Sequence, residues 1–174
     1  MTAEALTTKT LSPLALASGL VCLAALASIA AAHGFEHIGG YAPCPLCLKE
    51  RWAYYFAIPA GLVAFLLARA GHARAAGALL LLCALGFLIN SGVGVYHAGA
   101  EWKWWPGPAS CGGGSGVTAG ASGLLDTLNQ TRVIRCDEAS WRLFGLSFAG
   151  YSALISLGLA GVAVFGIGSR RSAR

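Results

Sequence analysis

Two cysteines separated by two residues, Cys44 and Cys47, form the most chemically distinctive stretch of the sequence, and Arg51 follows four residues later. A pair with this spacing can close a small disulfide ring or bind a metal ion. Pro45 favours a helix start, because its fixed φ suits the first helical turn and its missing N–H would be unpaired there anyway. In such a helix Cys44, Cys47 and Arg51 share one face. A helix N-terminus and a nearby guanidinium both favour the thiolate, so the spacing predicts reactive sulfur.

The composition indicates that this pair lies in a membrane protein. Hydrophobic residues make up 56% of the 174 positions and charged residues only 11%, whereas a soluble domain has about 25% charged residues. A soluble chain of this length must cover its surface with polar groups, so the composition excludes that class. The formal charge of +5 does not indicate nucleic-acid binding, because the basic residues are scattered around apolar stretches rather than gathered in a patch.

Four apolar stretches are long enough to cross a bilayer, whose hydrocarbon core is about 30 Å thick. They are expected at about 14–32, 52–68, 75–95 and 143–168. We therefore expect an all-α membrane protein, a single four-transmembrane-helix bundle over 1–174 with two cysteine-bearing loops at about 33–51 and 96–142. The first stretch also resembles a cleaved signal peptide, but it exceeds the roughly 7–15 apolar residues of such a segment, and further spans follow it.

The arrangement of the spans predicts the topology. Four spans place both termini and the turn 69–74 on one side and both cysteine-bearing loops on the other. Six basic residues fall on each side, so the positive-inside rule does not decide by count. They are denser in the turn 69–74 and in the last five residues than in the longer loops. We therefore expect cytoplasmic termini and extracytoplasmic cysteine-bearing loops.

The loop cysteines are Cys44, Cys47, Cys111 and Cys136, and three arrangements can be considered for them. A four-cysteine zinc site lacks the second paired spacing of a ribbon or finger, and an extracytoplasmic loop favours oxidation. Structural disulfides are the second arrangement: a bond from Cys111 to Cys136 would close a loop of 26 residues and stabilise it by about 3.5 kcal/mol. A ring as short as that between Cys44 and Cys47 constrains little, however. The third arrangement is two redox pairs that pass electrons by thiol–disulfide exchange.

Three stretches together carry a resemblance to a known family. They are Pro43–Cys47 with Glu50-Arg51, Tyr96-His97 through Trp102 to Cys111, and Cys136-Asp137-Glu138 through Trp141 to Tyr151. They resemble the bacterial disulfide bond formation protein B (DsbB) family over nearly the whole chain beyond residue 14. The resemblance implies a quinone-reducing protein-disulfide oxidoreductase of the bacterial inner membrane, with its cysteine-bearing loops in the periplasm. It implies ubiquinone or menaquinone as cofactor, and as partners a periplasmic DsbA-like thiol oxidase, the membrane quinone pool and the lipid bilayer, with no nucleic acid.

The same resemblance implies the roles of the four loop cysteines, as disulfides Cys44–Cys47 and Cys111–Cys136 without a metal. The reduced partner would attack Cys111, and the released Cys136 would pass electrons to the first pair. Cys47 would then face the quinone as a thiolate in charge-transfer contact. Apolar residues within 124–134 separately predict a short helix on the membrane surface between the two outer cysteines.

Three polar residues near these cysteines have open alternatives. The resemblance implies that Arg51 stabilises the thiolate and a quinone oxygen, whereas an interfacial arginine can also simply extend to the headgroups. His97 matches a histidine near the family's quinone pocket, but it could equally be a wetted helix end. Glu50 belongs to the matching motif but points off the face of Arg51, and we expect a structural role. A helix start favours a thiolate at Cys44, whereas the resemblance assigns quinone contact to Cys47, so the sulfur that carries the charge stays open.

Two further function classes stay open at this level. One is a disulfide-stapled membrane scaffold or transporter subunit, which would tolerate loss of Cys44 and Cys47. The other is a vitamin K epoxide reductase-like enzyme, which would carry its CxxC motif in a late span rather than after the first.

Overall fold

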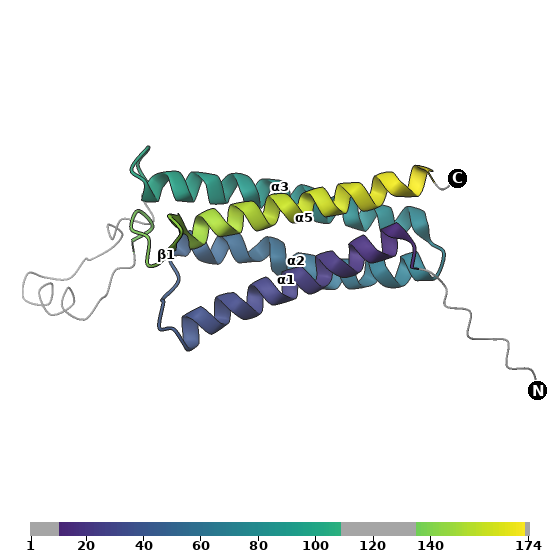
Figure 1. Ribbon diagram of the computed structural model, residues 1–174, viewed down its shortest axis with the longest axis horizontal. Helices are drawn as coiled ribbons and strands as arrows, with labels where there is room; N and C mark the ends of the chain where they lie inside the picture. Colours follow the sequence, from purple (N-terminus) through teal and green to yellow (C-terminus); the bar gives the residue numbers. More distant parts are fainter. Residues whose placement is uncertain (1–10, 109–134, 173–174) are drawn as a thin grey trace, which may run out of the picture.

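The computed structural model describes residues 11–108 and 135–172 and contains four long helices (Figure 1). They are α1 (Pro13–His37), α2 (Pro45–Arg69), α3 (Ala73–Glu101) and α5 (Phe148–Ser172). Each contains a segment that is long and apolar enough to cross a membrane. The predicted all-α, four-helix membrane fold is therefore confirmed. A two-stranded hairpin, β1 (Arg142–Leu143) with β2 (Leu146–Ser147), precedes the last helix.

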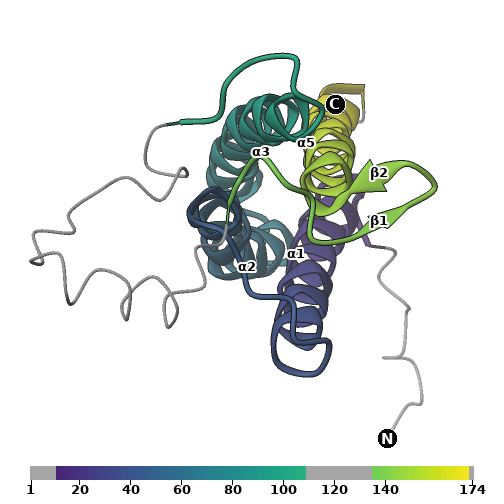
Figure 2. The same ribbon diagram turned by 90° about the vertical axis from the view of Figure 1, so that its left-hand side faces the viewer.

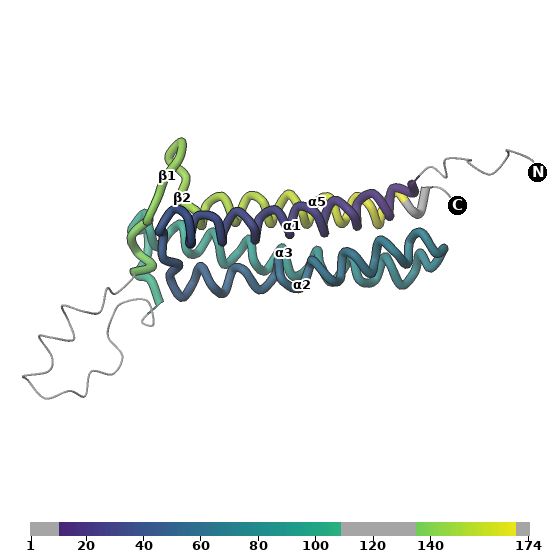
Figure 3. Tube along the Cα trace, turned by 90° about the horizontal axis from the view of Figure 1, so that it is seen from below, coloured from purple at the N-terminus to yellow at the C-terminus, as the bar shows by residue number. Residues whose placement is uncertain are grey.

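The helices form an antiparallel bundle in which α3 packs along α5 and α1 along α2 (Figure 2). The start of α1 and the end of α5 lie at one end of the bundle (Figure 3). The connection from α1 to α2 and the hairpin lie at the opposite end. The chain order thus brings the cysteine-bearing segments to a single end of the bundle.

Small residues let the helices approach closely. The interior is rich in buried alanines, and an added Cβ at Gly61 of α2 would lie 3.1 Å from the backbone nitrogen of Cys22 in α1. Lipid tails are as apolar as leucine, so helices in a membrane associate through close packing of this kind rather than through the hydrophobic effect. Cys83 is buried in this core, where a free cysteine packs as a small hydrophobic residue.

The helices extend beyond the expected membrane spans at the cysteine-bearing end. α2 begins at Pro45, the helix start that the sequence predicted, before the span expected from about 52, and α3 continues to Glu101, past the span expected to end near 95. The fourth helix begins at Phe148 rather than 143, because the hairpin occupies 142–147. Phe144 and Gly145 turn the hairpin with φ angles of 50° and 82°, and two successive residues with positive φ cannot continue a right-handed helix.

Candidate functional site

The Cys44–Cys47 segment forms the first turn of α2, as the position of Pro45 predicted. Cys44 is the N-cap residue, and its sulfur accepts a hydrogen bond from the backbone N–H of Cys47 at 3.1 Å. The Cys47 thiol lies 2.8 Å from the same sulfur, and both cysteines are free thiols. The structure therefore contains the reduced pair, and the Cys44–Cys47 disulfide stays a prediction.

His97 of α3 lies against Cys44, with its Nε2 atom 3.6 Å from the sulfur. Its Nδ1 atom lies 2.7 Å from Oε1 of Glu50, and both side chains are buried. The hydrogen bond from Cys47 lowers the pKa of Cys44 from 9.0 to about 4, against the opposing effect of burial and with a further contribution from His97. In this reduced pair, the hydrogen bonds thus favour the thiolate at Cys44, which sequence reasoning left undecided.

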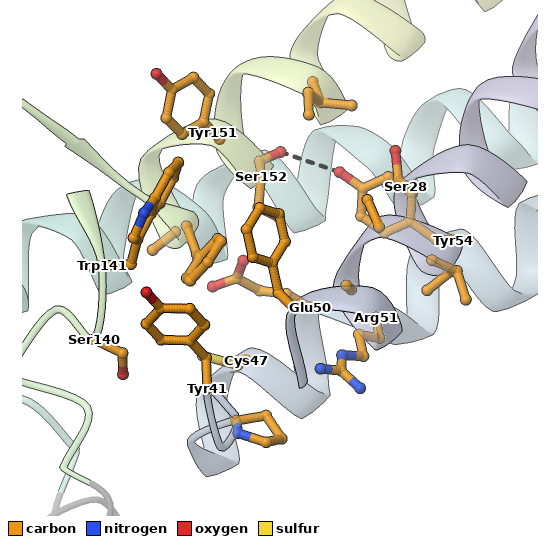
Figure 4. Close-up of a pocket in the computed structure, with 18 of the residues that line it drawn as sticks. Ser28, Tyr41, Cys47, Glu50, Arg51, Tyr54, Ser140, Trp141, Tyr151 and Ser152 are labelled. Carbon is orange, nitrogen blue, oxygen red and sulfur yellow. Dashed lines mark hydrogen bonds between the residues drawn. The ribbon is translucent and has the colours of Figure 1, made fainter. Parts of the chain in front are cut away.

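A cavity of about 360 Å³ opens beside the other sulfur of the pair. Four α2 residues line it, Cys47, Glu50, Arg51 and Tyr54 (Figure 4). Aromatic residues complete much of the wall: Phe35, Tyr41, Trp141, Phe148 and Tyr151. The Trp141 and Phe148 rings stack with centroids 4.8 Å apart, and Phe35 packs edge-on against Phe148 at 4.9 Å. This is a largely apolar pocket with few polar groups, the usual character of a small-molecule site.

Glu50 corrects one interpretation of the sequence. We expected a structural role off the reactive face, but Glu50 lines the cavity and also contacts His97. Cys47, Glu50, Arg51 and Tyr54 follow the i, i+3, i+4, i+7 spacing of one helical face. Counting that face from Cys47 rather than from Cys44 would have found Glu50.

Besides Cys47, the residues predicted to bind the cofactor are Arg51 and His97, and these two occupy different surroundings. Arg51 lines the cavity, as expected for such a role, and its guanidinium donates to the Glu36 carboxylate at 2.7 Å. His97 is not among the cavity-lining residues in the described part of the chain, but it contacts the lining residue Glu50 through Nδ1. A wetted helix end is excluded for His97, because the side chain is 2% exposed.

Cys136 is disulfide-bonded and lies in a buried cluster with Cys44 and Leu46, against which Cys47 also packs. Three of the four loop cysteines therefore meet at the start of α2. Cys111 and the predicted surface helix within 124–134 lie outside the described residues.

A salt bridge links the segment next to Cys136 to the end of α3. The Asp137 carboxylate accepts hydrogen bonds from Arg135 and, at 2.7 Å, from Lys103. Arg135 first and then Lys103 hold the pKa of Asp137 well below its usual range. Asp137 is therefore ionised at neutral pH. Its bond to Lys103 joins the segment that contains Cys136 to the end of α3.

Comparisons with known proteins identify the family of the chain. The family model described as Disulfide bond formation protein DsbB matches residues 15–166. A Disulfide bond formation protein B from Polaromonas sp. is 30% identical over 153 residues, which cover 81% of this chain and 83% of the relative. Its namesake from Marinobacter nauticus is 32% identical over 158 residues, covering 81% and 87%. No solved structure matches the chain. Since the family match covers most of the sequence, the chain belongs to the disulfide bond formation protein DsbB family.

Proposed function

We propose that this protein is a quinone-dependent thiol oxidoreductase that reoxidises a periplasmic DsbA-type disulfide donor. One observation carries the proposal: Cys47 lines an apolar cavity while its neighbour Cys44 packs against the disulfide-bonded Cys136. The same cysteine pair thus touches a possible electron acceptor site on one side and a second disulfide on the other. A structural staple has no need of either neighbour.

The cavity suits a quinone, the electron acceptor that the family resemblance implies. Its aromatic wall matches a flat apolar ring, and Arg51 and Glu50 are the polar groups that could bind the ring oxygens. A bound quinone supplies an acceptor for two electrons and two protons. Arg51 would hold an oxygen by a charge-assisted hydrogen bond, for which a guanidinium is well suited.

The chain's own sulfur atoms account for the electron transfer by thiol–disulfide exchange. A thiolate of the reduced partner attacks Cys111 of the proposed Cys111–Cys136 disulfide and releases Cys136 as a thiolate. Cys136 then attacks Cys44, the sulfur against which it packs, and releases Cys47 toward the cavity. The second partner thiol displaces Cys111, so the partner leaves as a disulfide. The freed Cys111 thiolate then attacks Cys136, which restores the Cys111–Cys136 disulfide and releases Cys44. Two electrons and two protons thereby reach the pair at the cavity.

The contacts of Glu50 give it a place in the proton transfer. Its carboxylate lies between the cavity and Nδ1 of His97, whose other nitrogen lies beside Cys44. A proton held by this buried pair can pass from the cysteine side to the cavity side without crossing water. We infer that Glu50 and His97 carry out this proton transfer, while Arg51 would bind and orient the quinone.

The proposed site faces the periplasm of a bacterial inner membrane. The basic turn 69–74 and the last helix end lie at the opposite end of the bundle, and dense basic residues favour the cytoplasmic side. Both termini are then cytoplasmic, and the cysteine end meets an oxidising compartment.

The proposal is tested by quinone reduction with purified protein in detergent, supplied with a reduced DsbA-type protein. Wild type should turn over, and Cys47→Ser should lose turnover because its hydroxyl cannot form the disulfide. Cys22→Ser, inside α1, is the matched control and should retain it. No turnover by folded wild type, or full turnover by Cys47→Ser, would reject the proposal.

A further inference from the structure

Three metal-ligating side chains meet at the start of α2, two of them buried and one half-buried. The sulfurs of Cys44 and Cys47 and a ring nitrogen of His97 all lie within 4.8 Å of one another. Cys44 and His97 are 4% and 2% exposed. Two thiolates and one imidazole are a common ligand set for zinc. This set differs from the four-cysteine site that the sequence spacing argued against, because His97 comes from another helix.

The distances in this set are close to those around a tetrahedral zinc ion. Zn–S and Zn–N bonds of about 2.3 and 2.05 Å place a sulfur and a nitrogen ligand about 3.5 Å apart, and Cys44 Sγ lies 3.6 Å from His97 Nε2. Two sulfur ligands would be about 3.8 Å apart, against 2.8 Å between the two thiols here. A side-chain rotation at the cavity-lining Cys47 would provide that extra separation.

Two acidic residues, Glu50 and Glu101, lie beside the two ring nitrogens of His97. Glu50 lies 2.7 Å from His97 Nδ1, and a carboxylate in that position orients the opposite ring nitrogen toward a metal. Oε1 of Glu101 lies 3.8 Å from Nε2 of the same histidine. Its other oxygen, Oε2, is buried without a hydrogen-bond partner among the described residues. A buried, unpartnered carboxylate oxygen is costly, and a cation beside His97 would give it a ligand role.

We propose that the reduced Cys44–Cys47 pair, His97 and Glu101 form a zinc site that exists only in the dithiol state. Binding of Zn²⁺ displaces the thiol protons as the two thiolates coordinate the metal, without a change in oxidation state. The disulfide form has no thiolate to donate and does not bind. Zinc therefore holds the protein in its reduced form and keeps Cys47 from the cavity. This last effect rests on the proposed function, whereas binding itself rests only on the geometry.

A second cluster of possible metal ligands lies elsewhere in the structure, and the experiment has to distinguish metal bound there from metal bound at Cys44 and Cys47. His33, Glu36 and His37 share the end of α1, with ligand atoms within 4.8 Å of one another. This cluster is more exposed, lacks a thiolate, and its carboxylate is already bonded to Arg51. A metal bound there would have no sulfur ligand, which gives the two sites different spectra.

The test uses Co²⁺ as a spectroscopic substitute for Zn²⁺, in protein that carries Cys111→Ser and Cys136→Ser so that the Cys44–Cys47 pair is the only loop thiol pair. The reduced protein should bind one Co²⁺ with a thiolate-to-cobalt charge-transfer band and tetrahedral visible bands, and Zn²⁺ should displace it. The same protein with an oxidised pair should show neither. Adding His33→Ala and His37→Ala should leave the spectrum unchanged.

Three variants assign the ligands. His97→Ala and Glu101→Gln should each weaken binding, and Glu50→Gln should weaken it about 10–100-fold as the loss of an orienting carboxylate. Circular dichroism identifies variants that fail to fold. If a ligand variant does not fold, the site is tested by comparing Co²⁺ binding to the reduced and the oxidised Cys111→Ser, Cys136→Ser protein.

Absence of the charge-transfer band in the reduced protein would overturn the site. A spectrum lost with His33→Ala and His37→Ala, or unaffected by a folded His97→Ala, would overturn it as well. Quinone reduction by the wild-type protein in metal-free buffer, supplied with a reduced DsbA-type protein, tests the proposed function separately. Normal turnover without cobalt binding would reject only the metal site, and cobalt binding without turnover would reject only the oxidoreductase.

Discussion

Replacing Cys47 by alanine removes the thiol that lies 2.8 Å from the Cys44 sulfur, and we expect the pKa of Cys44 to rise. The hydrogen bond from Cys47 is the largest cause of the lowered pKa, which falls from 9.0 to about 4. The backbone N–H of residue 47 and the His97 ring remain in the variant, so the pKa should rise only part of the way back.

The size of the change follows from the strength of that bond. A hydrogen bond to a charged group contributes about 1.5–3 kcal/mol, and one pKa unit corresponds to 1.36 kcal/mol. The Cys44 pKa should therefore rise by about one to two units, to about 5–6. Since the pKa is lowered in the fold, the thiolate's stabilising contribution is complete above the ordinary thiol pKa. It is lost as the pH falls through the folded-state value.

The assay follows thiolate absorbance in the ultraviolet against pH in reduced, metal-free protein carrying Cys111→Ser and Cys136→Ser. Cys47→Ser is the matched control, because its hydroxyl can still donate to Cys44 and should keep the pKa closer to about 4. Cys44→Ser should remove the low-pH transition altogether. Equal Cys44 pKa values in Cys47→Ala and Cys47→Ser would refute the hydrogen bond from residue 47 as the main cause of the low pKa. A transition that survives Cys44→Ser would refute the assignment of the charge to Cys44.

Two further outcomes follow from contacts at the same end of the bundle. A Cβ at Gly99 would overlap the Trp105 ring, whereas one at Gly92 meets nothing within 4 Å. Gly99→Ala should therefore destabilise by about 1–3 kcal/mol, and Gly92→Ala should not; thermal unfolding and tryptophan fluorescence measure this, and equal melting temperatures would contradict it. Lys103→Gln removes the bond to Asp137 and should raise the alkylation rate of a reduced Cys136 by no more than a few-fold, since exposed ion pairs are weak. High salt should raise the alkylation rate of Cys136 in wild type but not in Lys103→Gln. A salt effect of the same size in the variant would show that the Lys103–Asp137 bond does not limit access to Cys136.

The sequence alone determined the membrane fold and the location of the Cys44–Cys47 pair at a helix start. Helix length and apolar composition are local properties, so four spans and a helix start at Pro45 could be read from residue order. The grouping of loops at one end followed from the number of spans. The hairpin at 142–147 was missed because it depends on Phe144, a residue type that rarely adopts a positive φ.

Only the tertiary structure decided which residues surround the pair. The role of Glu50 depends on His97, which α3 brings beside it, and no spacing within α2 reveals that contact. The packing of Cys136 against Cys44 likewise joins segments that are distant in the sequence. The cavity needs aromatic residues from α1, from the connection between α1 and α2, from the segment before the hairpin and from α5, all around one face of α2. Charge, reactivity and access at a sulfur atom are set by neighbours in space, and the packing of the bundle determines those neighbours.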